Sequence, residues 1–93
     1  KINDIVLDPE KISGIIQWFN LLEKITDVDF AYFLIEDGFG GGIIKTRNGW
    51  DIKVKTTDVN AQLTELEYIL KNKVDKNNLF YIDLRYPGRV YWK

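Results

Sequence analysis

Two of the residue types that most often carry chemistry are missing: the 93 residues include no cysteine and no histidine. Their absence excludes thiol nucleophiles, zinc sites built from cysteine and histidine, imidazole bases and Ser-His-Asp triads. Only carboxylate, hydroxyl or lysine chemistry remains. The lack of cysteine does not indicate a compartment, because disulfides are permitted outside the cytoplasm but are not required there.

The chain also lacks a charge excess and a long apolar run. Thirteen basic and fourteen acidic residues give a net charge of −1, which argues against non-specific phosphate binding, since that depends on clustered positive charge. No run approaches the roughly twenty apolar residues needed to cross a bilayer, and no signal peptide is visible. A hydrophobic content of 45% predicts one ordered domain. Because the chain begins with lysine, we expect it to be a fragment of a longer protein.

Residues 8–26 carry the signature of an amphipathic helix. Asp8 is expected to cap its N-terminus and Pro9 to occupy its first position. Gly14 weakens a helix by roughly 1 kcal/mol relative to alanine, so we expect another backbone to come close there. Apolar residues at helical spacing predict a buried stripe that Trp18 extends sideways. The stripe consists of Ile12, Ile15, Ile16, Phe19, Leu22 and Ile25.

Residues 28–36 predict a strand that is apolar on both faces, which suggests that both are covered. The expected faces are Val28, Phe30, Tyr32 and Leu34 on one side, and Ala31, Phe33 and Ile35 on the other.

A glycine-rich stretch and a hairpin are predicted next. The run Gly40–Gly42 indicates a flexible connection, because a phosphate-binding loop would need a following helix with lysine and serine or threonine. Residues 43–47 and 50–55 then predict a hairpin around Asn48-Gly49, the favoured pair of a two-residue type I′ turn. In its second strand Trp50, Ile52 and Val54 are expected to point inward.

A second amphipathic helix is predicted after Thr57-Asp58, which is expected to supply its N-cap. Glu67 and Lys71 form an expected i,i+4 ion pair on it. Its apolar residues are Val59, Leu63, Leu66, Ile69 and Leu70. With two strands following, the order is αβββαββ. The sequence therefore predicts an α+β fold of two layers, with two helices on one face of an antiparallel sheet of about five strands.

Residues 79–93 predict a terminal hairpin. Phe80, Ile82, Leu84 and Tyr86 are expected on one face and Tyr81, Asp83 and Arg85 on the other. The sequence Tyr86-Pro87-Gly88-Arg89 predicts a type II turn. The returning strand, residues 89–93, is expected to leave its backbone groups unpaired at a sheet edge, where an extended partner segment can add a strand.

This terminal segment resembles the end of the extracytoplasmic β domain of the FtsQ/DivIB family of bacterial cell-division proteins. In that family a hydrophobic strand ends in D-L-R-Y or D-L-R-F, followed by a glycine turn and a final apolar strand. Asp83, Leu84, Arg85, Tyr86 and Gly88 match that pattern. Further back, the family has a hairpin with a glycine before its second strand, then a helix patterned L-x-x-L-x-x-I-L. Asn48 to Ile52, and Leu63, Leu66, Ile69 and Leu70, follow that order, so the similarity spans about two thirds of the chain.

The resemblance implies a non-catalytic divisome assembly domain on the extracytoplasmic side of the cytoplasmic membrane. A membrane anchor and a small domain would precede these residues in the whole protein. The implied partner is a small coiled-coil division protein of the FtsB/DivIC type, with an FtsL-like protein, bound during septum formation. No cofactor or metal is implied, and the domain alone is expected to be monomeric. The resemblance assigns partner binding to Arg85, Tyr86 and Gly88, and by position to Arg89, Val90, Tyr91 and Trp92.

Other classes of function stay open at this point. In a single-stranded nucleic-acid module, Tyr81, Tyr91 and Trp92 would stack bases while Arg85, Arg89 and Lys93 follow phosphates. A cell-wall hydrolase would use two of the carboxylates of Glu36, Asp37 and Asp83, which would have to flank a cleft. A calcium site at Asp27, Asp29 and Asp37 lacks the usual ligand loop. Nothing in the sequence sets the spacing that either acidic site needs.

Overall fold

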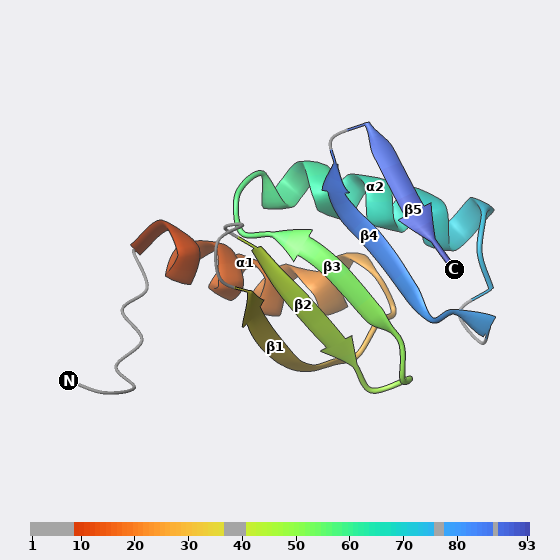
Figure 1. The fold of residues 1–93 in the computed structure, drawn as a ribbon, viewed down its shortest axis with the longest axis horizontal. Coiled ribbons are helices and arrows are strands. Elements are labelled where there is room, and N and C mark those ends of the chain that lie inside the picture. The colour runs from red at the N-terminus through yellow and green to blue at the C-terminus, as the bar shows by residue number, and fades with distance from the viewer. Residues whose placement is uncertain (1–8, 37–40, 76–77, 87) are drawn as a thin grey trace.

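Two helices cover one face of an open five-stranded sheet (Figure 1). The computed structural model describes residues 9–36, 41–75, 78–86 and 88–93. The elements follow the predicted αβββαββ order, and the expected two-layer α+β fold is confirmed. They are α1 (Pro9–Ile25), β1 (Phe30–Glu36), β2 (Gly41–Thr46), β3 (Asp51–Lys55), α2 (Val59–Asn72), β4 (Tyr81–Tyr86) and β5 (Arg89–Trp92).

The strands lie in sequence order across the sheet, so β1 and β5 form its two edges. Neighbouring strands are antiparallel except β3 and β4, which are parallel, with Ile52 opposite Ile82. The sheet is therefore mixed, whereas the sequence predicted an antiparallel one. Helix α2 returns the chain across one face of the sheet between β3 and β4, and such a crossover makes the two strands run in the same direction.

The core lies between the helices and the inner face of the sheet. Trp50, Ile52 and Val54 point inward as predicted and are buried. The opposite face of β3 carries Asp51 and Lys53, which are partly exposed. The predicted stripe of α2 is also confirmed, and Glu67 pairs with Lys71 at 3.4 Å. Buried apolar residues from every layer complete the core: Trp18, Leu22, Val28, Phe30, Ile44, Val59, Leu63, Leu66, Ile69, Ile82 and Leu84.

Helix α1 faces the sheet with a different stripe from the predicted one. Its buried residues are Gly14, Trp18 and Leu22. A Cβ on Gly14 would overlap the backbone carbonyl of Thr56, which confirms the expected close approach. The Trp18 indole also donates a 2.9 Å hydrogen bond to the Lys55 carbonyl. These two contacts set the rotation of the helix. They leave half of the predicted stripe exposed: Ile12 at 44%, Ile16 at 51% and Phe19 at 61%.

A β-bulge in β1 overturns the predicted assignment of its faces. Phe30 lies opposite Thr46 and Tyr32 opposite Lys45, so the register shifts between Phe30 and Tyr32. Cross-strand partners share a face. Phe30 therefore lies on the helix side with Phe33, while Tyr32 and Leu34 lie on the open side, where they are 54% and 43% exposed. The prediction that both faces are covered was wrong.

The two glycine predictions around β2 need correction. Gly41 and Gly42 belong to the strand itself and pair with β3, while Gly40 lies outside the described residues. Asn48 does not have the positive φ that a type I′ turn requires. Instead the Gly49 amide donates to the Thr46 carbonyl and Gly49 has a φ of 95°. This geometry corresponds to a three-residue hairpin loop that ends in a left-handed glycine.

The start of α2 is held by a side chain that the sequence did not single out. Asp58 occupies the N-cap position as predicted, but it has a φ of 53° and makes no side-chain cap hydrogen bond. The buried Gln62 amide binds the preceding connection instead. Its oxygen accepts from the Lys55 amide at 2.9 Å, and its nitrogen donates to the carbonyls of Lys55 and Thr57 at 3.0 and 2.7 Å. The other predicted cap, Asp8, lies outside the described residues.

Candidate functional site

Strand β5 lies at one edge of the sheet, as predicted for the end of the chain (Figure 1). It pairs with β4 on one side, with Tyr91 opposite Asp83 and Trp92 opposite Ile82. On its other side it borders no strand of the described chain. The Lys93 amide donates to the Tyr81 carbonyl, and the Tyr81 amide donates back to the Lys93 carbonyl. Since the direction of backbone groups alternates along a strand, the amides of Val90 and Trp92 point away from β4.

A second register shift, in β4, sets the faces of this hairpin. Between Asp83 and Tyr86 the strand has one residue more than β5 opposite it. The shift brings Tyr86 beside Tyr91, and their rings meet edge to face with centroids 5.9 Å apart. The prediction that Tyr86 shares the face of Ile82 and Leu84 was therefore wrong. Phe80 precedes the strand and is 73% exposed, so it is not part of the buried core.

Asp83 and Arg85, the charged residues of the D-L-R-Y sequence, bind each other within β4. One carboxylate oxygen of Asp83 accepts from the Arg85 backbone amide and from Nε, both at 3.0 Å, and the other accepts from Nη2 at 2.9 Å. Asp83 is buried, whereas Arg85 is partly exposed and lies 5.7 Å from the centre of the Tyr86 ring. The guanidinium is thus oriented by Asp83 rather than extended into solvent.

This pairing shifts the pKa of Asp83. Burial alone would raise that pKa, but the hydrogen bonds from Arg85 and the charges of Arg85 and Lys53 outweigh it and lower the pKa below the usual 3.8. A depressed folded-state pKa means that the ionised carboxylate stabilises the fold at pH values above the unfolded-state pKa. That contribution is lost as the pH falls through the folded-state value.

We therefore expect Asp83→Asn to lower the free energy of unfolding by about 1–3 kcal/mol at pH 7, because charge-assisted hydrogen bonds to a buried group are lost. The difference in the free energy of unfolding between wild type and variant should become smaller as the pH falls below the unfolded-state pKa of Asp83. Urea unfolding followed at pH 7, 5 and 3 measures this. Asp29→Asn, at an exposed carboxylate, is the matched control. A gap that is constant with pH would contradict the assignment.

The remaining predicted site residues lie at or near the edge. Gly88 is exposed and has a φ of 74°, as the third position of a type II turn requires, while Pro87 lies outside the described residues. Arg89 and Tyr91 are exposed. Val90 is partly buried and packs against the core. Trp92, 42% exposed, is paired with Ile82 and so lies on the opposite face from Tyr91.

The aromatic residues of the nucleic-acid alternative do not form one platform. Tyr81 and Tyr91 lie on the open face of the sheet, but Trp92 lies on the helix side. The Lys53 ammonium already sits 4.7 Å from the centre of the Tyr81 ring. The described part of the last hairpin therefore offers no continuous row of rings and positive charges along which bases could stack and phosphates could bind.

The carboxylates of the hydrolase alternative are not gathered in a cleft by the described residues. Asp83 is buried against Arg85, Glu36 ends β1 at the other edge, and Asp37 lies outside the described residues. Within the described ranges no three acidic residues lie close enough to hold a metal ion. Asp27 and Asp29, from the calcium alternative, are both exposed.

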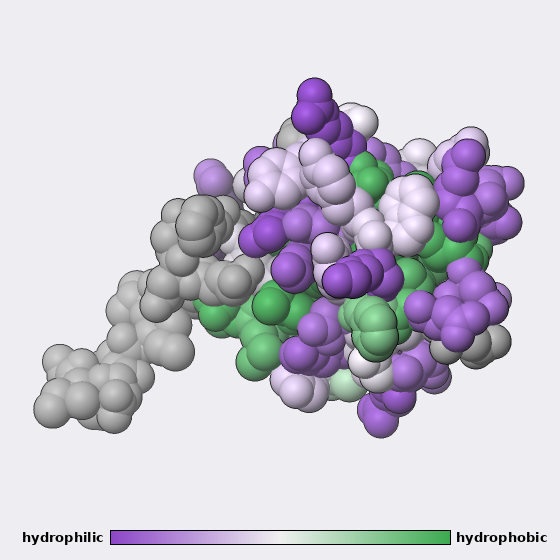
Figure 2. Space-filling model, turned by 45° about the vertical axis from the view of Figure 1, so that its right-hand side comes forward, coloured by the Kyte–Doolittle hydropathy of each residue, from purple (hydrophilic) through white to green (hydrophobic). Residues whose placement is uncertain are grey.

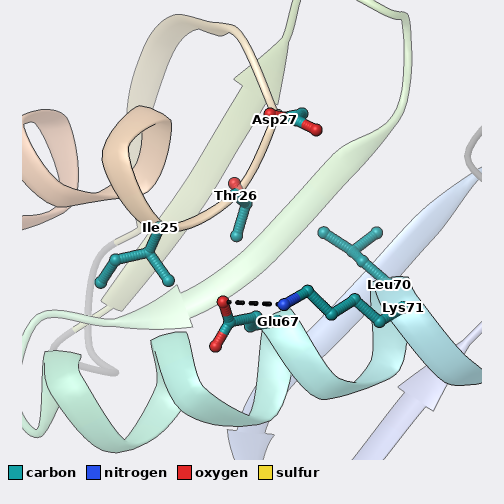
Figure 3. A pocket seen from close by; sticks show the side chains of 6 residues that line it. All are labelled: Ile25, Thr26, Asp27, Glu67, Leu70 and Lys71. Atoms are coloured by element: carbon teal, nitrogen blue, oxygen red, sulfur yellow. Dashed lines mark hydrogen bonds and ion pairs between the residues drawn. The ribbon is translucent and has the colours of Figure 1, made fainter.

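A small pocket of about 110 Å³ lies between the end of α1 and the side of α2 (Figure 3). Glu67 and Lys71 form their ion pair at its rim, and the Asp27 side chain lies away from both. The pocket is well below the roughly 300–1,000 Å³ of typical small-molecule sites. It brings together no pair of groups with an evident chemical role.

The fold and its exposed border define a small α+β domain whose open sheet offers edges for strand pairing. Protein-family models and curated proteins provide no match to this chain. Neither helix in the described part of the chain is long and apolar enough to span a membrane.

Proposed function

We propose that this domain is a non-catalytic assembly domain that binds a small coiled-coil division protein by adding a partner strand to β5. The partner is of the FtsB/DivIC type, accompanied by an FtsL-like protein, and binding occurs during septum formation. In the whole protein the domain is held on the extracytoplasmic side of the cytoplasmic membrane. The observation that carries the proposal is the position of β5 at a border of the sheet, next to the D-L-R-Y sequence.

Strand addition explains how the exposed groups of this edge act together. Backbone hydrogen bonds to the outward amides of Val90 and Trp92 supply affinity, and side chains on alternate faces select the partner. Tyr86 and Tyr91, about half exposed and in contact with each other, present a rigid aromatic surface. Tyrosine is enriched at such hot spots because it buries a large area. Arg85, oriented by Asp83, places positive charge beside these rings and favours an acidic residue on the partner.

Tyr86→Ala and Tyr91→Ala should each weaken partner binding by about 2 kcal/mol, roughly thirtyfold. The measurement is titration calorimetry with the soluble coiled-coil region of an FtsB/DivIC-type protein from the same genome. Tyr68→Ala is the matched control, because Tyr68 is a similarly exposed tyrosine on α2. Melting curves by circular dichroism show that each variant is folded.

A backbone variant separates strand addition from other kinds of contact. Val90→Pro removes an amide that points away from β4, so the strand keeps its pairing within the domain while partner binding falls. Val90→Ala removes similar side-chain contacts but keeps the amide, and it should bind more tightly than Val90→Pro. Full affinity in Tyr86→Ala, Tyr91→Ala and Val90→Pro would overturn the proposal.

A further inference from the structure

We propose that a second copy of this chain binds at the opposite edge of the sheet, forming a twofold dimer in which the two β1 strands pair antiparallel. The two α1 helices would then meet across the same axis. The sequence predicted a monomer, but it also predicted that the apolar residues of α1 and β1 are covered within the domain. Because this interface lies at β1, it is independent of the proposed partner site at β5.

An apolar surface spans two layers of the molecule at this edge. The helix layer contributes Phe19, whose ring contacts the Phe30 ring of β1 with centroids 5.4 Å apart. Ile12 and Ile16 continue the exposed side of α1 from Phe19 at helical spacing. The strand contributes exposed side chains to both faces of the sheet: Tyr32, Leu34 and Ile35. In Figure 2 some hydrophobic side chains lie beside the large group of grey atoms, and others lie across the middle and right of the same face.

The two edges differ in length and charge. Strand β5 has four residues and carries Arg89, with Lys93 just after it. A second copy would bring like charges together at this short edge, which disfavours self-pairing but not pairing with an acidic partner segment. Strand β1 has seven residues and no charged residue before its last one, Glu36. Its bulge lies near the start of the strand, so the stretch from Tyr32 to Ile35 is regular and apolar.

Among the described residues, no strand pairs with the outer side of β1, so its outward backbone groups can take part in this pairing. The Thr46 amide donates to the Trp50 carbonyl, on the β3 side. Because the direction of backbone groups alternates along a strand, the amide and carbonyl of Ile44 also point toward β3. Phe33, opposite Ile44, therefore points its amide and carbonyl away from β2, and so does Ile35. A twofold axis at Leu34 places Phe33 of each copy opposite Ile35 of the other. All four outward groups at these two positions would then be paired in each strand.

The size and shape of the surface favour a second copy over an isolated strand. Six roughly half-exposed side chains of about 200 Å² each expose on the order of 600 Å². With the strand backbone, this is the most that each copy could bury, and it approaches the ~800 Å² per partner of a standard interface. An added peptide would cover the strand but leave Ile12, Ile16 and Phe19 exposed. A second copy brings a strand and a helix together, because a twofold axis perpendicular to the sheet keeps both helix layers on the same side.

The test is sedimentation velocity of the domain and its variants across a wide concentration range. We expect a reversible monomer–dimer equilibrium. Leu34→Lys should raise the dimer dissociation constant at least about tenfold, because the axis places the two new charges opposite each other. Phe19→Lys should do the same through the helix layer. Tyr68→Lys, a change at an exposed aromatic residue on α2, should leave the dimer intact, as should Val90→Pro at the other edge.

The outcomes separate this interface from the partner site. Only monomer at every concentration would overturn the dimer, as would a dimer that survives both Leu34→Lys and Phe19→Lys. A dimer lost in Val90→Pro and kept in Leu34→Lys would move self-association to β5 and contradict the proposal. Partner binding by Leu34→Lys is expected to be unchanged, so failure of the dimer and failure of the proposed function can be told apart.

Discussion

Replacing Gly14 with alanine is expected to lower the free energy of unfolding by about 3 kcal/mol or more, the upper range for a residue added to a packed contact. The new Cβ would overlap the backbone carbonyl of Thr56. Backbone atoms at the end of β3 cannot move aside as a flexible side chain can, so α1 would have to shift as a unit. That shift would also break the hydrogen bond from Trp18 to the Lys55 carbonyl.

The measurement is urea unfolding of Gly14→Ala against Ser13→Ala. Ser13 is the exposed neighbour on the same helix, and alanine there should be neutral or slightly stabilising because alanine has the highest helix propensity. The higher helix propensity of alanine should also favour Gly14→Ala. A lower free energy of unfolding in that variant is therefore due to the steric overlap with Thr56. Equal stability of the two variants would show that α1 does not rest on the Thr56 backbone.

Gln62→Leu is expected to lower the free energy of unfolding by about 3 kcal/mol, because it leaves several buried backbone groups without hydrogen-bond partners at once. The leucine has a similar size but can neither accept from the Lys55 amide nor donate to the carbonyls of Lys55 and Thr57. Asp58 provides no side-chain cap to replace them. The junction between β3 and α2 would therefore lose the contacts that order it.

Gln17→Leu is the matched control for that variant, since it makes the same substitution at an exposed glutamine of α1. Its stability should change by less than about 0.5 kcal/mol, as is usual for surface positions. Hydrogen exchange should show faster opening at the first turn of α2 in Gln62→Leu than in Gln17→Leu. Similar unfolding midpoints for the two variants would refute a structural role of the Gln62 amide.

Predictions from local pattern succeeded where one signal dominated. The alternation of Ile52 and Val54 placed β3, and the spacing of Leu63, Leu66 and Ile69 placed α2 with its buried side inward. The unfavourable position of Gly14 within a helix correctly indicated a close backbone approach. The turn signature at residues 86–89 predicted the terminal hairpin, and its second strand lies at a border of the sheet as expected.

The predicted inward-facing side of a helix or strand was wrong where contacts with a distant segment of the chain set its orientation. The exposed Phe19 matched helical periodicity as well as the buried residues do, but the rotation of α1 depends on Thr56 and Lys55, about forty residues away. The bulges that move Tyr32 and Tyr86 to the open face depend on pairing with another strand. No local signal in the sequence marks either shift.

By itself, the sequence determined the order of the helices and strands and the spacing of apolar residues in each. It also excluded thiol and imidazole chemistry. Those properties depend on residue type and on spacing within one element. Only the tertiary structure decided the parallel pairing of β3 with β4, the pairing of Asp83 with Arg85, and the exposure of an apolar stripe along β1. Each of these arises when separate segments pack together, because helix rotation and strand register are set by the partner surface.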